Sequence, residues 1–505
     1  MFPPSAQPSV VVIGGGVSGL LAARRLASAG ARVTLLERGA RLGGQIHTVE
    51  LGGRRVDVGA EAVHLALPAM KAVVAELGLD SAVEASRPGT SWLWTGRRRR
   101  VLPAGVGPAG PTQIKPVLTS RVMGPAGLVR AGLEPVAAHR AGPIDLSHGH
   151  DISVGEFVTR RFGRAVSELF VDPLLGSLHS GNVDELSLRA CAPSLVPAAS
   201  KGTSLLRNRP AAPKRAPGAP PPVMFANWAG GLSTLTDALI AGVDADIRLG
   251  AHVVGLSAVA DESAAAGSAA DSASTLPESV SAPPAPASTE YPRYRVQLAT
   301  GETITADGVV LAVPSAVAAE LVAGAAPSAA ATLRETRIAS TATIVLGFKR
   351  REVEHLPALA GNGFLVPSRY GTLVKAGTHL STKWAHLDDG ETVLVRASAG
   401  RAGSGLLDSL DDTALLDHVR RDLRTFTAID APPTLAHIQR WTTGLPQLTV
   451  GHPDRIASAR STLASRMPGV ELAGASYDGI GIAACLGSAE KAAARLAALL
   501  DLPVA

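Results

Sequence analysis

The stretch SVVVIGGGVSGLLAARRLASAGARVTLLER, residues 9–38, decides the fold of this chain. Its first residues form an apolar run with branched side chains, which is typical of a buried parallel strand. Gly14, Gly16 and Gly19 then give G-x-G-x-x-G, a segment with helical spacing follows, and a second strand leads to Glu37. Such glycines allow a tight turn, close approach of the backbone to a pyrophosphate and close helix–strand packing, while the acid binds ribose hydroxyls. The stretch therefore predicts an adenine dinucleotide bound with its phosphates at a helix N-terminus.

The composition of the chain bounds its class. A length of 505 residues suffices for two or three domains, and 46% hydrophobic residues allow a sizeable core although only 3% are aromatic. The N-terminal residues lack the pattern of a secretory signal, and no 18-residue apolar run predicts a transmembrane helix. The two cysteines, Cys191 and Cys485, form no CxxC motif and fit a reducing compartment. We expect a cytoplasmic protein without a metal site.

The net charge of +5 is modest, and its basic residues concentrate at Arg97–Arg100 and between Lys201 and Arg215. A solvated basic face is the simplest interpretation of these clusters. Attraction to an anionic substrate, to an anionic membrane surface or to an acidic partner is the alternative. Nucleic acid is not expected, because no aromatic residues interleave with these arginines.

The order of motifs predicts an α/β protein with a discontinuous Rossmann-like dinucleotide-binding domain. A second strand–glycine–helix unit, from Val470 to about Leu500, places part of this domain at the far end of the chain. We expect its three parts at residues 1–91, 224–314 and 436–505. An α+β domain at residues 315–435 and a mostly helical insertion at residues 92–223 separate them. Residues 260–290, rich in Ala, Ser and Pro, are predicted to be a disordered insert within a small antiparallel meander.

Further strings repeat a pattern known from one group of flavoproteins. They are Arg41-Leu42-Gly43-Gly44, Trp228-Ala229-Gly230-Gly231, Gly181–Arg189 (GNVDELSLR), Gly363–Pro367 (GFLVP), Arg440-Trp441, Pro446-Gln447, Gly451-His452 and Gly474–Ile482 (GASYDGIGI). With the glycine motif, these strings resemble the FAD-dependent coproporphyrinogen III and protoporphyrinogen oxidases of the amine-oxidase-like superfamily. The resemblance covers nearly the whole chain apart from the predicted insert.

The resemblance implies non-covalently bound FAD and assigns its contacts. The implied cofactor-binding residues are Gly14, Gly15, Gly16, Val17, Ser18, Gly19, Glu37, Arg38, Gly44, Gln45, Gly59, Ala60, Glu61, Ala62, Val63, Val253, Trp441, Ile480, Gly481 and Ile482. Val253 meets the adenine through its backbone, and Trp441 with Ile480–Ile482 closes over the isoalloxazine. Covalent attachment in the superfamily uses a cysteine of the last loop, and Cys485 lies beyond that position. The family often continues this loop as Ile-Pro-x-Cys, whereas here Ile482 is followed by Ala-Ala-Cys.

The family reaction takes six electrons from a porphyrinogen and reduces three O₂ to three H₂O₂, with flavin N5 as the hydride acceptor. The protein then mainly orients a large macrocycle beside the cofactor. No catalytic triad or metal cluster is evident, so no catalytic side chain is assigned. Glu61 and Lys383 are the candidate substrate residues, although Glu61 occupies a position that varies within the family between acidic and basic residues.

The Gly-, Ala- and Arg-rich composition suggests a GC-rich bacterium, where coproporphyrinogen III is the more frequent family substrate; protoporphyrinogen IX is the alternative. The implied partners are this porphyrinogen, O₂ and a ferrochelatase that receives the product, with at most peripheral membrane association. Two other functions stay open: an amine or carotenoid oxidase or desaturase, and a non-catalytic relative similar to the GDP-dissociation inhibitors. The intact glycine motif argues against the last.

Overall fold

The centre of the molecule is a five-stranded parallel sheet, seen in a computed structural model that describes residues 7–147, 149–208, 223–259 and 293–503. Its strands, in spatial order, are β12 (Ala245–Arg248), β2 (Arg32–Leu36), β1 (Ser9–Ile13), β16 (Gly308–Leu311) and β22 (Val470–Leu472). All four neighbouring pairs are parallel. Branched apolar side chains fill β1 and β16 because both faces of the sheet are covered. One sheet thus joins segments from distant parts of the chain, which confirms the predicted fold class.

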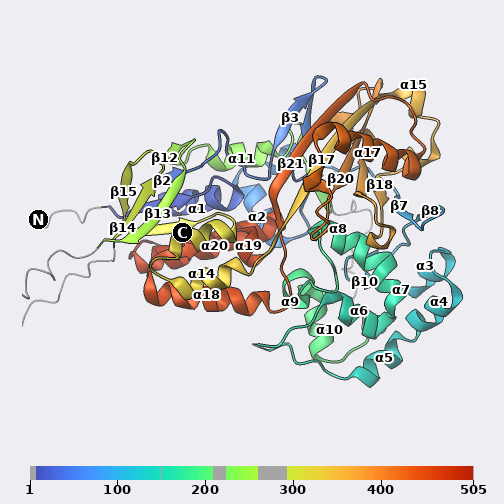
Figure 1. Cartoon of the computed structure of the whole chain (residues 1–505), viewed down its shortest axis with the longest axis horizontal. Helices are drawn as coiled ribbons and strands as arrows, with labels where there is room; N and C mark the ends of the chain where they lie inside the picture. Colours follow the sequence, from blue (N-terminus) through green and yellow to red (C-terminus); the bar gives the residue numbers. More distant parts are fainter. Residues whose placement is uncertain (1–6, 148, 209–222, 260–292, 504–505) are drawn as a thin grey trace, which may run out of the picture.

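Helices cover one face of this sheet and a mixed layer covers the other (Figure 1). On the first face lie α1 (Val17–Ser28), α2 (Pro68–Glu76), α11 (Ser233–Ile240) and α20 (Ile482–Leu499). On the second lie α13 (Ser315–Val322), α14 (Pro327–Arg334), α18 (His452–Arg466) and the antiparallel meander of β13 (Val253–Ala258), β14 (Tyr294–Leu298) and β15 (Thr303–Ala306). The predicted insert at residues 260–290 lies outside the described residues.

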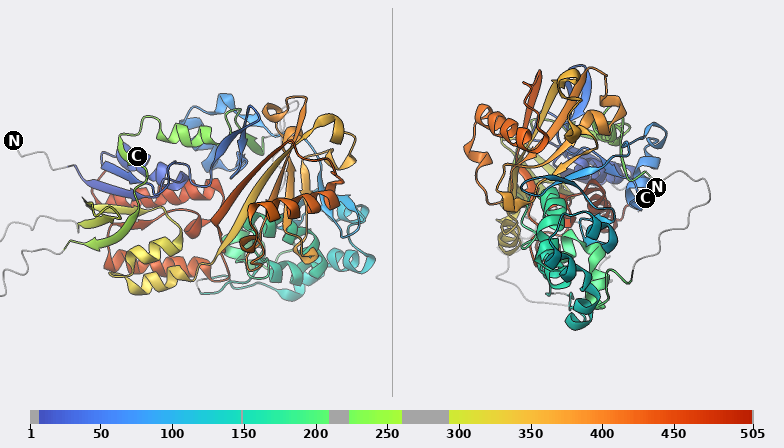
Figure 2. Two further views of the ribbon diagram at one scale, coloured as in Figure 1. Left: turned by 45° about the horizontal axis from the view of Figure 1, so that its top comes forward. Right: turned by 90° about the vertical axis from the view of Figure 1, so that its right-hand side faces the viewer.

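A second sheet of seven strands forms the neighbouring lobe (Figure 2). In spatial order they are β21 (Leu435–Pro446), β17 (Ile338–Lys349), β20 (Thr392–Ala399), β19 (Val374–His379), β18 (Gly363–Leu365), β7 (Ser91–Trp94) and β8 (Arg99–Val101). The amphipathic helix α17 (Asp412–Thr427) packs on one face of this sheet through its buried side chains. We call this the outer face, and the opposite one, which looks toward the parallel-sheet part and the helical lobe, the inner face.

The third lobe is helical and surrounds a core of its own. Its helices are α3 (Ile114–Thr119), α4 (Pro125–Gly132), α5 (Glu134–Ala141), α6 (Val154–Phe162), α7 (Arg164–Val166), the π-helix Ser167–Gly176, α8 (Ser177–His179), α9 (Leu188–Cys191) and α10 (Val196–Ser200). Ser153 caps α6 by accepting a hydrogen bond from the Glu156 N–H at 3.0 Å. No helix of the described residues has the length and apolar character needed to cross a membrane.

The seven-stranded sheet takes strands from outside the range predicted for the α+β domain. β7 and β8 fall within the predicted helical insertion at residues 92–223, yet they extend the seven-stranded sheet through the parallel pair β18–β7. β21 falls within the predicted last part of the dinucleotide domain, residues 436–505, yet it pairs along its length with β17. The partners that place β7 and β21 in this sheet, β18 and β17, lie far away in the sequence, so no local pattern shows the pairing.

Candidate functional site

Glycines crowd the turn between β1 and α1. Gly14 has φ +106°, and a Cβ there would lie 2.4 Å from the Ala312 carbonyl oxygen. A Cβ on Gly19 would lie only 1.8 Å from the Gly14 carbonyl oxygen. At Gly16, by contrast, the nearest atom to a built Cβ is 3.9 Å away, so the turn is open on that side. The backbone forms a cradle whose tight side excludes any side chain and whose open side lies at the start of α1.

Two helix N-termini meet at this cradle. α1 begins after Gly16 and α20 begins after Gly481, and no side chain caps either helix. The Ser18 hydroxyl donates a hydrogen bond to the Cys485 carbonyl oxygen at 2.9 Å, which fixes the two first turns against each other. Uncapped first-turn N–H groups and the positive ends of two helix dipoles therefore face the same region. This donor set fits the phosphates of a dinucleotide.

Glu37 lies at the end of β2, beside the cradle. Its two carboxylate oxygens accept hydrogen bonds from the backbone N–H groups of Gly15 and Gly39, at 2.7 and 2.6 Å. Its carbonyl oxygen accepts one from the Ala251 N–H at 2.9 Å, and this brings the start of β13 with Val253 alongside. A carboxylate oxygen has more than one lone pair, so both can also accept from a ligand hydroxyl. The neighbouring Arg38 is exposed.

The glycine pair Gly43-Gly44 joins the cradle to the next part of the site. The Gly43 N–H donates to the Gly15 carbonyl oxygen at 2.8 Å, and a Cβ on Gly44, whose φ is +57°, would lie 3.0 Å from the Gly16 Cα. The Gln45 amide then donates to the Gly444 carbonyl oxygen at the end of β21. Sequence segments more than 390 residues apart are thereby joined beside the cradle.

The loop Gly59–Val63 lies between Gln45 and Trp441. A Cβ on Gly59 would lie 1.9 Å from the Gln45 carbonyl oxygen and 3.1 Å from the Trp441 ring. The Ala60 N–H also donates a hydrogen bond to the Gln45 carbonyl oxygen. Val63 pairs with Ala226 in a short antiparallel ladder, and Ala62 is half-buried. The Trp441 indole N–H donates to the Val58 carbonyl oxygen at 3.2 Å. Along the C-terminal loop, α19 (Ala475–Asp478) lies against β21; beyond it Ile480 and Ile482 are half-buried and Gly481 is exposed.

Glu61 and Lys383, the two predicted substrate residues, contact each other. The Lys383 ammonium lies 2.7 Å from one Glu61 carboxylate oxygen, and the Trp384 indole N–H donates to the same oxygen at 3.1 Å. The Arg396 guanidinium lies 2.8 Å from the other oxygen and also donates to the Gly59 carbonyl oxygen. We call Glu61, Lys383 and Arg396 the carboxylate clamp. It ties the Gly59–Val63 loop to the inner face of the seven-stranded sheet and has a net charge of +1.

The clamp keeps Glu61 ionised. Burial would raise the pKa of its carboxyl, but the charges of Lys383 and Arg396 and the hydrogen bonds from Lys383 and Trp384 outweigh burial and lower the pKa to about 2. Both carboxylate oxygens face cationic donors and the pKa is low, so Glu61 is not placed to act as a general base.

Sequence reasoning missed Arg396 and Lys375, because neither belongs to a local motif. Lys375 lies at an irregularity in the pairing of β19 with β20, and only 2% of it is exposed. Its ammonium nitrogen contacts the Ser180 hydroxyl of the helical lobe and forms no ion pair with any described residue. Burial, together with the positive charges of Arg401 and Arg396, lowers its pKa to about 7. A buried lysine between two lobes is a signal that only the folded structure gives.

The family model described as flavin containing amine oxidoreductase matches residues 17–497. The chain belongs to this family. It is therefore an oxidoreductase with a flavin cofactor, and the predicted resemblance is confirmed. The described residues hold no group of three or more His, Cys, Asp or Glu side chains that could bind a metal ion.

Curated relatives of this oxidoreductase match it over almost its full length. It is 33% identical to a Mycobacterium tuberculosis protein named coproporphyrinogen III oxidase, over 98% of this chain and 99% of the relative. It is 28% identical to a Bacillus subtilis protein of the same name, over 94% and 95% of the two chains. It is also 28% identical to the bovine protein named protoporphyrinogen oxidase, over 97% and 98%.

Solved structures show the same architecture. A crystal structure from Exiguobacterium, whose name assigns it to protoporphyrinogen oxidase, has a TM-score of 0.78 and 25% identity, covering 97% of this chain and 98% of that one. Putrescine oxidase bound to putrescine has a TM-score of 0.64 at 13% identity, covering 98% and 100%. The latter similarity is one of fold alone.

Proposed function

We propose that this protein is an FAD-dependent oxidase that uses O₂ to convert coproporphyrinogen III into coproporphyrin III, with three O₂ reduced to three H₂O₂. The observation that carries the proposal is the 33% identity to the mycobacterial coproporphyrinogen III oxidase over nearly the whole of both chains. When bound, FAD supplies an acceptor that takes two electrons at a time and passes them to O₂. The chain itself binds and orients the two molecules.

The cradle supports FAD as the flavin. We infer that the first-turn N–H groups of α1 bind its pyrophosphate and that the Glu37 oxygens accept the ribose hydroxyls. We assign the flavin end to Gln45, the Gly59–Val63 loop, Trp441 and the C-terminal loop. Non-covalent binding is supported by Cys485: its thiol is buried, its sulfur lies 3.6 Å from the Gly479 carbonyl oxygen, and burial raises its pKa to about 12, so it is a poor nucleophile.

The clamp supports an anionic substrate. Its net positive charge lies on the inner face of the seven-stranded sheet, next to the region assigned to the flavin. A positive field at a binding cleft favours a substrate with carboxylates, and coproporphyrinogen III has four where protoporphyrinogen IX has two. Lys383 and Glu61 then act by setting this field and by positioning the loop, and their ionic contact with each other leaves no free carboxylate as a base.

Protoporphyrinogen IX is the second candidate substrate, supported by the 28% identity to the bovine protein. An anaerobic panel of both porphyrinogens with a polyamine, followed by admission of air, tests the choice through porphyrin fluorescence and H₂O₂ release. We expect coproporphyrinogen III to react at least tenfold faster than protoporphyrinogen IX. Formation of H₂O₂ from the polyamine alone would refute the porphyrinogen proposal, and colourless protein that does not bind FAD would refute both.

We further propose a cytoplasmic protein that associates peripherally with the membrane and passes its product to a ferrochelatase. Large apolar side chains are exposed on the helical lobe. They are Leu118 on α3, Val129 on α4, Leu133 between α4 and α5, and Val136 on α5. Co-sedimentation with anionic liposomes at low salt is expected for the native protein and weaker for Val129→Ser/Leu133→Ser. Equal sedimentation of both proteins would count against this surface.

A further inference from the structure

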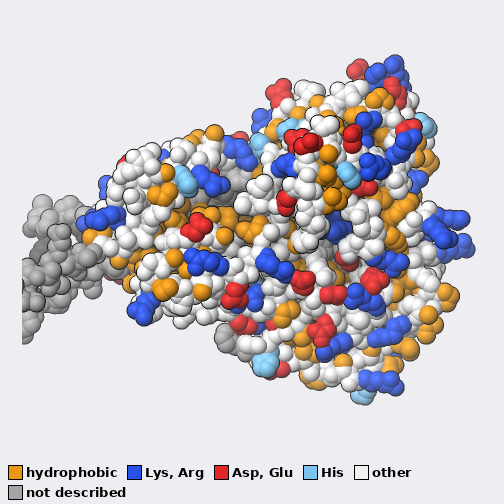
Figure 3. Space-filling view, viewed as in Figure 1, with side chains coloured by type: hydrophobic (Ala, Val, Ile, Leu, Met, Phe, Trp, Pro, Cys, Tyr) orange, Lys and Arg blue, Asp and Glu red, His pale blue; other side chains and the backbone are white. Residues whose placement is uncertain are grey.

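A hollow opens on the outer face of the seven-stranded sheet, at the edge formed by β7 and β8. Trp92, Trp94 and Phe426 contribute aromatic walls, and Arg97, Arg98 and Arg99 contribute to its lining. We call it the Trp–Arg pocket. Basic side chains gather at the right-hand edge of Figure 3, where Figure 1 places β8. Its volume of about 440 Å³ is within the range of small-molecule sites.

The pocket lies on the side of the sheet opposite to the carboxylate clamp. Trp92 pairs with Phe364, which pairs with Gly377 and through it with Ala397, so these residues share the outer face. Arg396 precedes Ala397 on β20 and therefore projects to the inner face. A ligand in the Trp–Arg pocket would consequently bind away from the region assigned to the flavin.

The aromatic walls are held in place. The Trp92 indole N–H donates to the Ala360 carbonyl oxygen at 2.7 Å. Trp94 packs edge-on against Phe426 with 5.3 Å between ring centroids. Rigid aromatic walls lose little conformational entropy when a flat aromatic ligand stacks on them.

The guanidinium groups of the pocket face no carboxylate of the lining. Arg97, Arg98 and Arg99 form no ion pair with any described carboxylate, and the lining contains no Asp or Glu. One terminal nitrogen of Arg99 is buried without a hydrogen-bond partner, and burial alone lowers the pKa of this guanidinium. A buried donor without an acceptor is costly, and a ligand that brings carboxylate oxygens would remove that cost.

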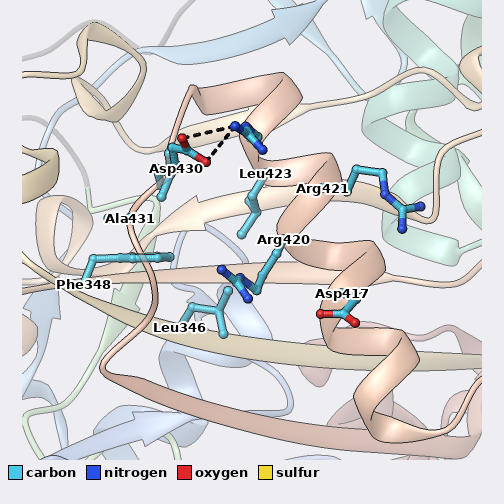
Figure 4. A pocket seen from close by; sticks show the side chains of 10 residues that line it. Leu346, Phe348, Asp417, Arg420, Arg421, Leu423, Asp430 and Ala431 are labelled. Carbon is cyan, nitrogen blue, oxygen red and sulfur yellow. Dashed lines mark hydrogen bonds and ion pairs between the residues drawn. The ribbon is translucent and has the colours of Figure 1, made fainter.

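A second hollow on the same outer face provides the contrast (Figure 4). It lies between α17 and β17, and its lining includes Arg420, Arg421 and Arg424 together with Asp417 and Asp430. Arg424 and Asp430 form an ion pair at 3.0 Å. Part of the positive charge is balanced within this hollow, and no tryptophan lines it. Of these two hollows, the Trp–Arg pocket is therefore the one that combines tryptophan walls with arginines that face no carboxylate of the lining.

We propose that the Trp–Arg pocket is a second binding site for a planar aromatic polycarboxylate, and that its ligand is the carboxylated porphyrin released by the enzyme. The choice of porphyrin rests on the proposed function. Guanidinium groups bind carboxylates in a bidentate manner, and indole rings stack on an aromatic macrocycle. A lipid surface is disfavoured as the occupant, because a single exposed large apolar side chain among the described residues, Val101, lies on the strands β7 and β8 beside this pocket, whereas four lie together on and between α3, α4 and α5. The site would hold product outside the catalytic cleft, before the next protein takes it.

The test uses the flavin-loaded full chain and added coproporphyrin III, measured by equilibrium dialysis and quenching of tryptophan fluorescence. The variant is Arg97→Ser/Arg98→Ser, whose side chains are exposed at the tip of the β7–β8 hairpin. Arg420→Ser/Arg421→Ser in the second hollow is the matched control. We expect at least tenfold weaker porphyrin binding at one site of the variant, unchanged binding in the control, and initial rates of porphyrinogen oxidation within twofold of the native protein in both.

Equal porphyrin affinity and stoichiometry in the native protein and the variant would overturn the proposal. The proposal would also be overturned if the variant bound porphyrin normally but no longer bound anionic phospholipid vesicles or poly-glutamate. That result would identify a lipid or an acidic protein as the occupant. Because the porphyrin is added, the result does not depend on turnover. Failure of the proposed function would appear separately, as an absence of porphyrin formation in the native protein.

Discussion

The parallel sheet and the seven-stranded sheet hold their polar groups in opposite ways. Around β1 and α1 the donors are backbone N–H groups, and Gly14 and Gly19 leave no room for a Cβ. On the inner face of the seven-stranded sheet the polar groups are buried side-chain charges, namely the carboxylate clamp and Lys375. Backbone dipoles cannot titrate and have fixed geometry, whereas a buried charge depends on its partner and on pH. The backbone donors of the first region suit the binding of one constant cofactor. In the second region, single side-chain substitutions can alter which substrate is bound.

The largest expected effect comes from Glu61→Gln, which leaves two buried cations without their carboxylate. Breaking a buried ion pair by removing one partner costs about 3–5 kcal/mol, and we expect a loss of this size in the free energy of unfolding by urea. Glu354→Gln, at an exposed glutamate, is the control and should change it by less than about 0.5 kcal/mol. Equal stability of both variants would mean that the clamp does not hold the loop to the sheet.

Lys375→Met tests the pH dependence of the same lobe. The folded pKa of Lys375 is about 7 and the unfolded value is 10.5, so between these pH values the unfolded chain binds more protons. Stability of the native protein therefore rises with pH across this window, by at most about 1.4 kcal/mol per pH unit from this group. The methionine variant should be more stable than the native protein at pH 7 and lose that advantage toward pH 9. A difference in melting temperature that does not vary with pH would show that Lys375 is not buried as a neutral amine.

Gly19→Ala tests the region held by backbone. The new methyl would lie 1.8 Å from the Gly14 carbonyl oxygen, so α1 must move away from the turn. Overpacking of this kind costs about 1–3 kcal/mol, and flavin absorbance of the purified protein should fall at least tenfold. Gly324→Ala, where a Cβ has no neighbour within 4 Å, should keep its flavin. Normal flavin content in Gly19→Ala would contradict the placement of the phosphates.

Ser18→Ala has the smallest expected effect. It removes the hydrogen bond to the Cys485 carbonyl oxygen, with an expected cost of about 1 kcal/mol. If this contact aligns two helix N-termini at one ligand, the variant should also release flavin faster in stopped-flow dilution. Lowered stability with an unchanged release rate would restrict the contact to packing.

The parallel-sheet part could be predicted from sequence because each of its signals is local. Residues 9–38 contain strand, glycine turn, helix and acid in one run, and the C-terminal repeat of this pattern indicated that the domain is discontinuous. The carboxylate clamp could not be predicted in this way. Glu61 and Arg396 are 335 residues apart in the sequence, and the three clamp residues share no motif. The sequence indicates Glu61 and Lys383 separately as candidates, but it does not show that they contact each other. The pairing of β7 with β18 was hidden for the same reason.

The hydrogen bond between Ser18 and Cys485 also bears on biosynthesis. α1 is among the first helices to leave the ribosome, whereas its neighbour α20 is synthesised more than 450 residues later. At about 5–20 residues per second the nascent chain must wait roughly half a minute to a minute and a half for this partner. Until α20 is synthesised, the side of α1 that packs against it stays uncovered and the cradle is incomplete. Binding of the cofactor therefore cannot stabilise the chain during translation. Availability of flavin should therefore govern how much completed protein survives, rather than how much is made.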